Sequence, residues 1–172
     1  SGMGSNITGI TTNEKLADPY AWKNVLALPL VGSANDVSNS VNSGSTTKAV
    51  TVTNAVASSA ASNFYGGSWY FDGSGDYLNV PANSDFSFDG DFTIELWMNT
   101  STFSLDTYYR RVVSTGPDSA AAIQLLFLTG SSTPKISVRS NAQLINGTID
   151  AATGAWVHVA VARSGSSLKL FV

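Results

Sequence analysis

Strict alternation of side chains marks the stretch Phe92-Thr93-Ile94-Glu95-Leu96-Trp97-Met98. Successive side chains of a β-strand point to opposite faces. The apolar residues at the first, third, fifth and seventh positions of this stretch therefore share one face. Residues 156–163 repeat the pattern, with three valines on one face and Trp156, His158 and two alanines on the other. Because both faces of both stretches are fairly apolar, the pattern predicts strands inside a sandwich. We therefore expect the strand tryptophans and His158 to belong to the core.

Short segments rich in β-branched and aromatic residues recur along the chain between turn residues. Asp89-Gly90 and Asn146-Gly147 are two of the expected turns. Many short strands at regular spacing predict an all-β fold, an antiparallel β-sandwich or jelly roll. The remaining expected strands are residues 25–30, 48–53, 68–71, 77–80, 110–114, 123–129, 135–139, 143–149 and 168–172.

The composition excludes several classes of protein. Charged residues make up 12% of the 172 residues, and only two of the 12 acidic residues are glutamates. Long helices and coiled coils use Glu and Lys, so a helical bundle is excluded. A net charge of -3 gives no basic surface for nucleic acid. The chain has no Cys, hence no disulfide or thiolate chemistry, and no apolar run long enough for membrane insertion.

The domain organisation expected from the sequence is simple. Residues 1–5 are interpreted as the remnant of a tag, residues 6–23 as an N-terminal leader, and residues 24–172 as one β-sandwich. A length of 172 residues suits one domain, since domains commonly hold roughly 100–200 residues.

Several segments together resemble laminin G-like domains of the concanavalin A-like lectin/glucanase superfamily. The resemblance rests on residues 25–30, 35–38, 70–78, 91–97, 156–160 and 167–172, whose order and spacing match along most of the chain from about residue 24. It implies a two-sheet jelly roll, often with a calcium ion at one rim, that binds sugars or proteins. Such modules occur in bacterial surface proteins and in phage tail or fibre proteins, which implies an extracellular or virion-surface location.

The sequence departs from the family pattern at its end. Family members continue past the strand that corresponds to residues 168–172, whereas this chain stops there. We therefore expect a C-terminally truncated sandwich. An open sheet edge would favour edge-strand self-association.

The residues do not support catalysis. Laminarinase-like relatives carry a Glu-x-Asp-x-x-Glu arrangement on one strand, but here Glu95 is followed by Trp97 and Thr100 at the corresponding positions. Glycoside hydrolysis needs two carboxylates. His158, the only histidine, would have to serve any Ser–His–Asp triad. The sequence therefore predicts a protein that is not an enzyme.

Calcium is the candidate cofactor, because Ca²⁺ takes six to eight oxygen ligands and several loops carry Asp without Lys. Asp36 and Asp76 are the expected metal ligands. None of these loops has the spacing of an EF-hand, and Asp is also a common turn residue. The alternative for each of them is therefore a structural role in a turn.

The candidate ligand-binding residues are aromatic and basic. Tyr108, Tyr109 and Arg110 lie together between two expected strands, and Tyr65 precedes two glycines. Aromatic rings pack on the apolar face of a sugar ring, and Arg donates paired hydrogen bonds. We expect a recognition module that binds a glycan or a surface protein. The alternatives are a structural module of a phage tail or adhesin without a small ligand, and a degenerate glycoside hydrolase domain.

Overall fold

The computed structural model describes residues 19–101, 110–116, 122–128, 135–140, 143–150 and 153–172. The described elements are almost all strands, and these pair antiparallel, which confirms the prediction of an all-β sandwich. The chain divides into two compact units, residues 1–87 and residues 88–172. The interpretation of residues 24–172 as one module stays a prediction.

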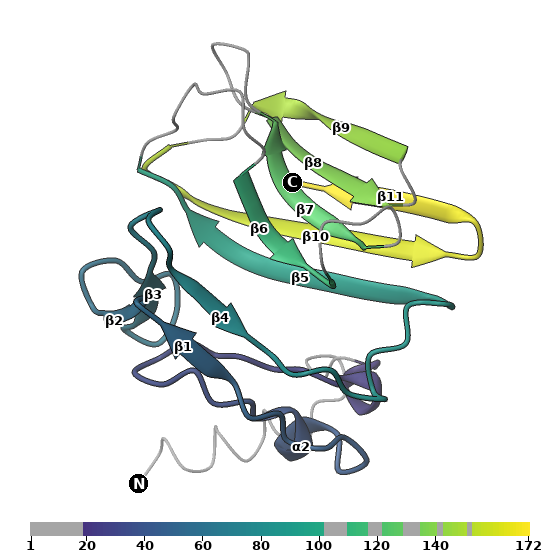
Figure 1. The fold of residues 1–172 in the computed structure, drawn as a ribbon, viewed down its shortest axis with the longest axis horizontal. Helices are drawn as coiled ribbons and strands as arrows, with labels where there is room; N and C mark the ends of the chain where they lie inside the picture. The colour runs from purple at the N-terminus through teal and green to yellow at the C-terminus, as the bar shows by residue number, and fades with distance from the viewer. Residues whose placement is uncertain (1–18, 102–109, 117–121, 129–134, 141–142, 151–152) are drawn as a thin grey trace, which may run out of the picture. The chain divides into compact units, whose positions relative to one another are not determined.

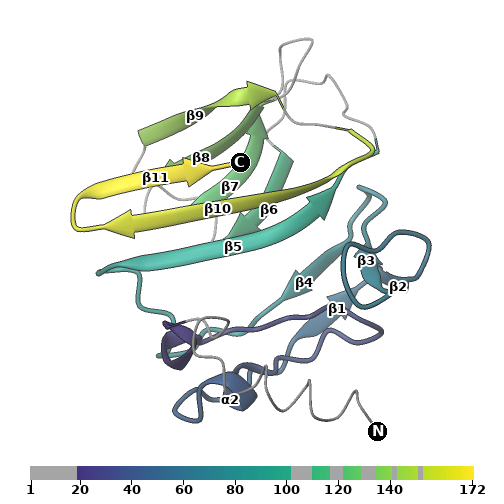
Figure 2. The same ribbon diagram turned by 180° about the vertical axis from the view of Figure 1, so that it is seen from behind.

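The second unit contains two antiparallel sheets (Figures 1 and 2). The first sheet has the order β11-β10-β5, with β10 in the centre, and the second has the order β6-β7-β8-β9. The three-stranded sheet comprises β5 (Phe92–Asn99), β10 (Trp156–Ser164) and β11 (Ser167–Phe171). The four-stranded sheet comprises β6 (Arg110–Ser114), β7 (Gln124–Leu128), β8 (Lys135–Ser140) and β9 (Gln143–Asp150).

The core of this unit lies between the two sheets. Val159 and Val161 of the central strand β10 are almost fully buried and belong to one cluster with residues of the facing sheet. The apolar residues of the alternating stretch in β5 pack against that cluster, as the period of two predicts. The buried members of the cluster are Ile123, Leu125, Phe127, Ile136, Val138, Val159 and Val161.

The first unit contains short elements. β1 (Thr51–Thr53) pairs with β4 (Tyr77–Asn79), and β2 (Val56–Ser58) pairs with β3 (Ser68–Tyr70). Two single turns of helix precede them, η2 (Ala21–Lys23) and α2 (Ser38–Val41). Of the expected leader, residues 19–23 are described, whereas the expected tag lies outside the described residues.

One expected strand of this unit is absent. Residues 25–30 are not in a strand, so that prediction was wrong. Their backbone is instead tied to a single loop: the Ala27 amide donates to the Asp36 carboxylate at 3.0 Å, and the Val37 amide donates to the Ala27 carbonyl at 2.9 Å. Leu30 ends the segment with φ 55°, which is incompatible with a strand.

Gly147 lies inside β9, so the expected turn at Asn146-Gly147 was also wrong. The pairing of β8 with β9 shifts register between Lys135 and Ser137, where Ile136 alone faces residues 147–149, which indicates a β-bulge in β9 that includes Gly147. A Cβ atom built on Gly147 would collide with the carbonyl oxygen of Ile136. Glycine is therefore required here by the close approach of two backbones.

Gly147→Ala should destabilise the protein by about 1–3 kcal/mol, because the backbone of β8 must shift to admit the methyl group. Gly90→Ala is the matched control, since its Cβ would meet nothing within 4 Å and its φ is not positive. Urea unfolding of both variants measures the difference. Equal stability of the two variants would contradict the close approach.

Candidate binding site

The outer face of the β5–β10–β11 sheet carries the most distinctive cluster of side chains in the second unit. Residues of these strands that do not point into the core point outwards, since the strand period is two. They are Thr93, Glu95, Trp97 and Asn99 of β5, Trp156, His158, Ala160, Ala162 and Ser164 of β10, and Ser167, Lys169 and Phe171 of β11. We call this set the Trp97 face.

Trp97 and His158 form the aromatic part of this face. They lie opposite each other in the β5–β10 pairing, and their ring centroids are 5.1 Å apart with an interplanar angle of 36°. The Trp97 side chain is a large apolar group left 45% exposed. His158 Nε2 lies 3.4 Å from Glu95 Oε2, so the carboxylate stands beside the two rings.

A small residue separates the two edge strands at the centre of the face. Ala160 pairs with Glu95 on one side and with Phe171 on the other, and its methyl group is almost buried. Phe171 is 52% exposed. The face therefore presents an apolar centre with a carboxylate and a tryptophan along one strand and a phenylalanine along the other.

This arrangement suits binding rather than bond cleavage. Glu95 is the only acidic residue of β5, β10 and β11, and the ion pair described for it is with His158. A glycosidase places two carboxylates about 5–9.5 Å apart across the scissile bond, and these three strands supply one. Exposed aromatic rings beside a few polar groups are typical of a ligand-binding surface.

Comparison of the sequence with models of protein families identifies the superfamily of the chain. A laminin G-type family model, described as the concanavalin A-like lectin/glucanases superfamily, matches residues 72–172, which is more than half of the chain. The chain belongs to this superfamily. The searches of curated proteins and of solved structures found no match.

Membership supports a lectin-like module that binds carbohydrate or protein. Laminin G-like domains are generally non-catalytic and typically extracellular. Among the described residues of this laminin G-like chain, no helix is long and apolar enough to cross a membrane.

The expectation that Trp97 and His158 belong to the core was wrong. Both point to the outer face of the laminin G-like sheet, where Trp97 is exposed and the side chain of His158 is 41% exposed. The alternation had placed Trp97 on the same side as Glu95, opposite the buried residues of β5. That shared side was the signal that could have identified the site.

The predicted ligand-binding residues do not form one cluster. Tyr108 and Tyr109 lie outside the described residues. Arg110 begins β6, is exposed, and pairs with Phe127 in the four-stranded sheet. Tyr65 lies in the first unit, between β2 and β3, and is 87% exposed. Their roles in binding stay predictions.

Asp36 is the centre of a buried hydrogen-bond network. Its Oδ1 accepts from the amides of Ala27 and Ser38 at 3.0 and 2.9 Å. Its Oδ2 accepts from the Ser38 hydroxyl at 3.0 Å and the Lys48 amide at 2.9 Å. Burial raises the pKa of Asp36, but these four hydrogen bonds outweigh burial and hold the pKa below its usual range.

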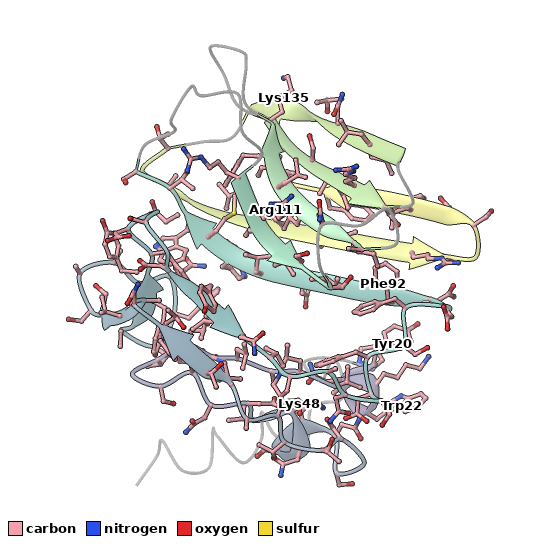
Figure 3. All side chains as sticks on the ribbon, viewed as in Figure 1. Tyr20, Trp22, Lys48, Phe92, Arg111 and Lys135 are labelled. Carbon is pink, nitrogen blue, oxygen red and sulfur yellow. The ribbon has the colours of Figure 1, made fainter. Side chains whose placement is uncertain are left out.

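Lys48, labelled in Figure 3, completes this network. Its buried Nζ donates to the Val25 carbonyl at 2.5 Å and to the Ser45 hydroxyl at 2.9 Å. It also forms an ion pair with Asp85 at 2.5 Å. The hydrogen bond from Lys48, followed by that from the Thr46 amide, lowers the pKa of Asp85. The network thus joins three separate segments of the first unit.

The residues present do not fit a calcium ion at Asp36. Both carboxylate oxygens already accept hydrogen bonds, and three of these bonds come from backbone amides. A calcium ion bound to the carboxylate would leave these three buried amides without a hydrogen-bond partner. Asp76 is half-buried beside the exposed residues 72–75, and its Oδ2 accepts from the Asp72 amide at 2.6 Å. The described residues contain no group of three His, Cys, Asp or Glu that could hold a metal.

Acid should destabilise the first unit through Asp85 and Asp36. Their folded-state pKa values lie below the value of about 3.9 for an unfolded aspartate, so the stability they contribute is present above pH 4 and is lost as the pH falls below it. Urea unfolding between pH 5 and pH 2 should show this loss. Asp85→Asn should flatten the profile, whereas Asp89→Asn, at an exposed position, should leave it steep. Equal slopes for both variants would contradict the assignment.

Proposed function

We propose that this laminin G-like chain is a carbohydrate-binding module and that the Trp97 face is its binding surface. The observation that carries the proposal is the exposed Trp97 ring beside His158 and Glu95 on one face of a sheet. A soluble domain gains little by leaving a tryptophan exposed, whereas a sugar-binding domain needs such a ring.

The chemistry of the face matches that of a sugar ring. The C–H groups on one side of a pyranose pack on an indole ring, which removes apolar surface of both from water. The hydroxyl groups at the ring's edge then need donors and acceptors, which Glu95, His158 and Asn99 supply from neighbouring positions. The pleated sheet holds all these side chains in fixed register, so little order has to be imposed on binding.

A protein partner is the second candidate function, in keeping with a structural role in an adhesin or a phage tail. It is favoured by Phe171, which is 52% exposed, because its ring extends the apolar part of the face onto β11. Aromatic residues at the centre of a patch are typical of protein interfaces.

Trp97→Ala should weaken glycan binding at least tenfold, because the stacking surface is lost, while Trp97→Phe should retain part of it. A glycan array identifies the ligand, and isothermal titration then compares the variants. Trp22→Ala removes another exposed tryptophan, in the first unit, and serves as the control.

Two results would contradict the proposal. One is unchanged glycan affinity in Trp97→Ala; the other is the absence of any glycan ligand together with capture of a protein partner that Phe171→Ala abolishes. The second result would establish the interaction module instead.

Calcium dependence stays a prediction, and we place it at Asp76 rather than Asp36, because Asp76 is half-buried next to an exposed bend, whereas Asp36 is buried. If Asp76 holds calcium, adding calcium should raise the unfolding temperature of the wild type and leave Asp76→Asn unchanged. Differential scanning calorimetry with calcium and with a chelator measures both. A calcium response that persists in Asp76→Asn would rule out this position.

A further inference from the structure

The loop between β2 and β3 presents two adjacent aromatic rings to solvent. The last pair of the hairpin is Ser58 opposite Ser68, so residues 59–67 form the loop. Phe64 is 50% exposed and Tyr65 is 87% exposed, and their ring centroids are 6.0 Å apart at an interplanar angle of 44°. Burial in the fold does not account for the Tyr65 ring.

The backbone at Tyr65 is strained. Its φ of 58° lies in the left-handed region, which costs a residue with a side chain about 1–2 kcal/mol, and Gly66 follows with φ 74°. Glycine would occupy position 65 without that cost. A strained backbone that holds an exposed ring outwards points to a function for the ring.

The loop is nevertheless held in one conformation. The Ser62 hydroxyl donates to the Phe64 carbonyl at 2.7 Å, and the Ser68 hydroxyl donates to the Ala61 carbonyl at 2.6 Å. At its end, Gly67 packs against Val31 so closely that a Cβ atom on Gly67 would lie 3.1 Å from Val31 Cγ1. These contacts preorganise the rings, which lowers the entropy lost when a ligand binds.

The stretch of chain that carries the two rings is uncharged. No Asp, Glu, Lys, Arg or His occurs from residue 49 to residue 71, a span that includes both strands of the hairpin. Exposed aromatic rings in an uncharged stretch that contains several serines match a neutral, hydroxyl-rich ligand rather than an ionic one.

We propose that Phe64 and Tyr65 form a second sugar-contact site, separate from the Trp97 face and selective for neutral polysaccharides. It lies outside residues 72–172, which match the family model, and so it is a feature of this chain rather than of the matched region. The proposal rests on the proposed function in one respect, since it assumes that the chain binds glycans.

Affinity electrophoresis through gels that contain dextran, galactomannan or xylan tests the proposal, with alginate as the charged polysaccharide. Tyr65→Ala should weaken retardation by a neutral polysaccharide at least fivefold. Tyr65→Gly should weaken it as much while its unfolding temperature stays equal to or rises above that of the wild type, because glycine relieves the positive φ. Tyr20→Ala removes another exposed tyrosine, 66% exposed, and should leave retardation unchanged.

Parallel measurements on Trp97→Ala separate the two proposals. Loss of retardation in Trp97→Ala but not in the Tyr65 variants overturns this inference alone. Loss in the Tyr65 variants but not in Trp97→Ala supports this inference and overturns the assignment of the Trp97 face. Retardation by alginate and by none of the neutral polysaccharides overturns this inference and leaves carbohydrate binding intact.

Discussion

The packing of Val159 and Val161 between the two sheets of the second unit determines everything proposed for its surface. Both valines are almost fully buried in the central strand β10. Because neighbouring side chains of a strand point to opposite faces, burying these two fixes His158 and Ala160 on the outside. The pairing of β10 with β5 then places Trp97 beside His158. A slip of one residue in that register would bury Trp97 and Glu95 and expose the apolar residues of β5.

The sequence predicts the strands of this unit and the two faces of each strand, but it does not predict which faces are exposed. The period of two gives the strands and sorts their side chains into two sets, and the resemblance of residues 156–160 and 91–97 to laminin G-like strands gives the fold. The period does not say whether the second set is covered by another layer. Trp97 and His158 were assigned to the core because of their size and surroundings, although the sheet leaves their face exposed. The hydrophobicity of an aromatic side chain does not show whether the side chain is buried in the core or exposed on the surface.

The first unit shows a different limit. Residues 25–30 have the composition of a strand, yet their backbone is bound by an aspartate nine residues further along the chain, which also binds the Lys48 amide. Asp36 was expected to hold calcium because loop aspartates often do. Its partners come from segments up to twelve residues away, and sequence spacing does not show which donors will converge on a carboxylate. In this chain, the carboxylate oxygens of Asp36, which could have bound a metal, instead hold together separate backbone segments through hydrogen bonds.

The two aromatic surfaces differ in what surrounds their rings, and this difference predicts different ligands. Trp97 stands beside an ionisable pair, Glu95 and His158, so its hydrogen bonds can be charge-assisted and directional. Tyr65 lies in a span of the chain without charge, where stacking and neutral hydrogen bonds are the available interactions. If both surfaces bind glycans as proposed, the choice between charged and neutral glycans rests on the few ionisable groups of the Trp97 face, which are Glu95, His158 and Lys169.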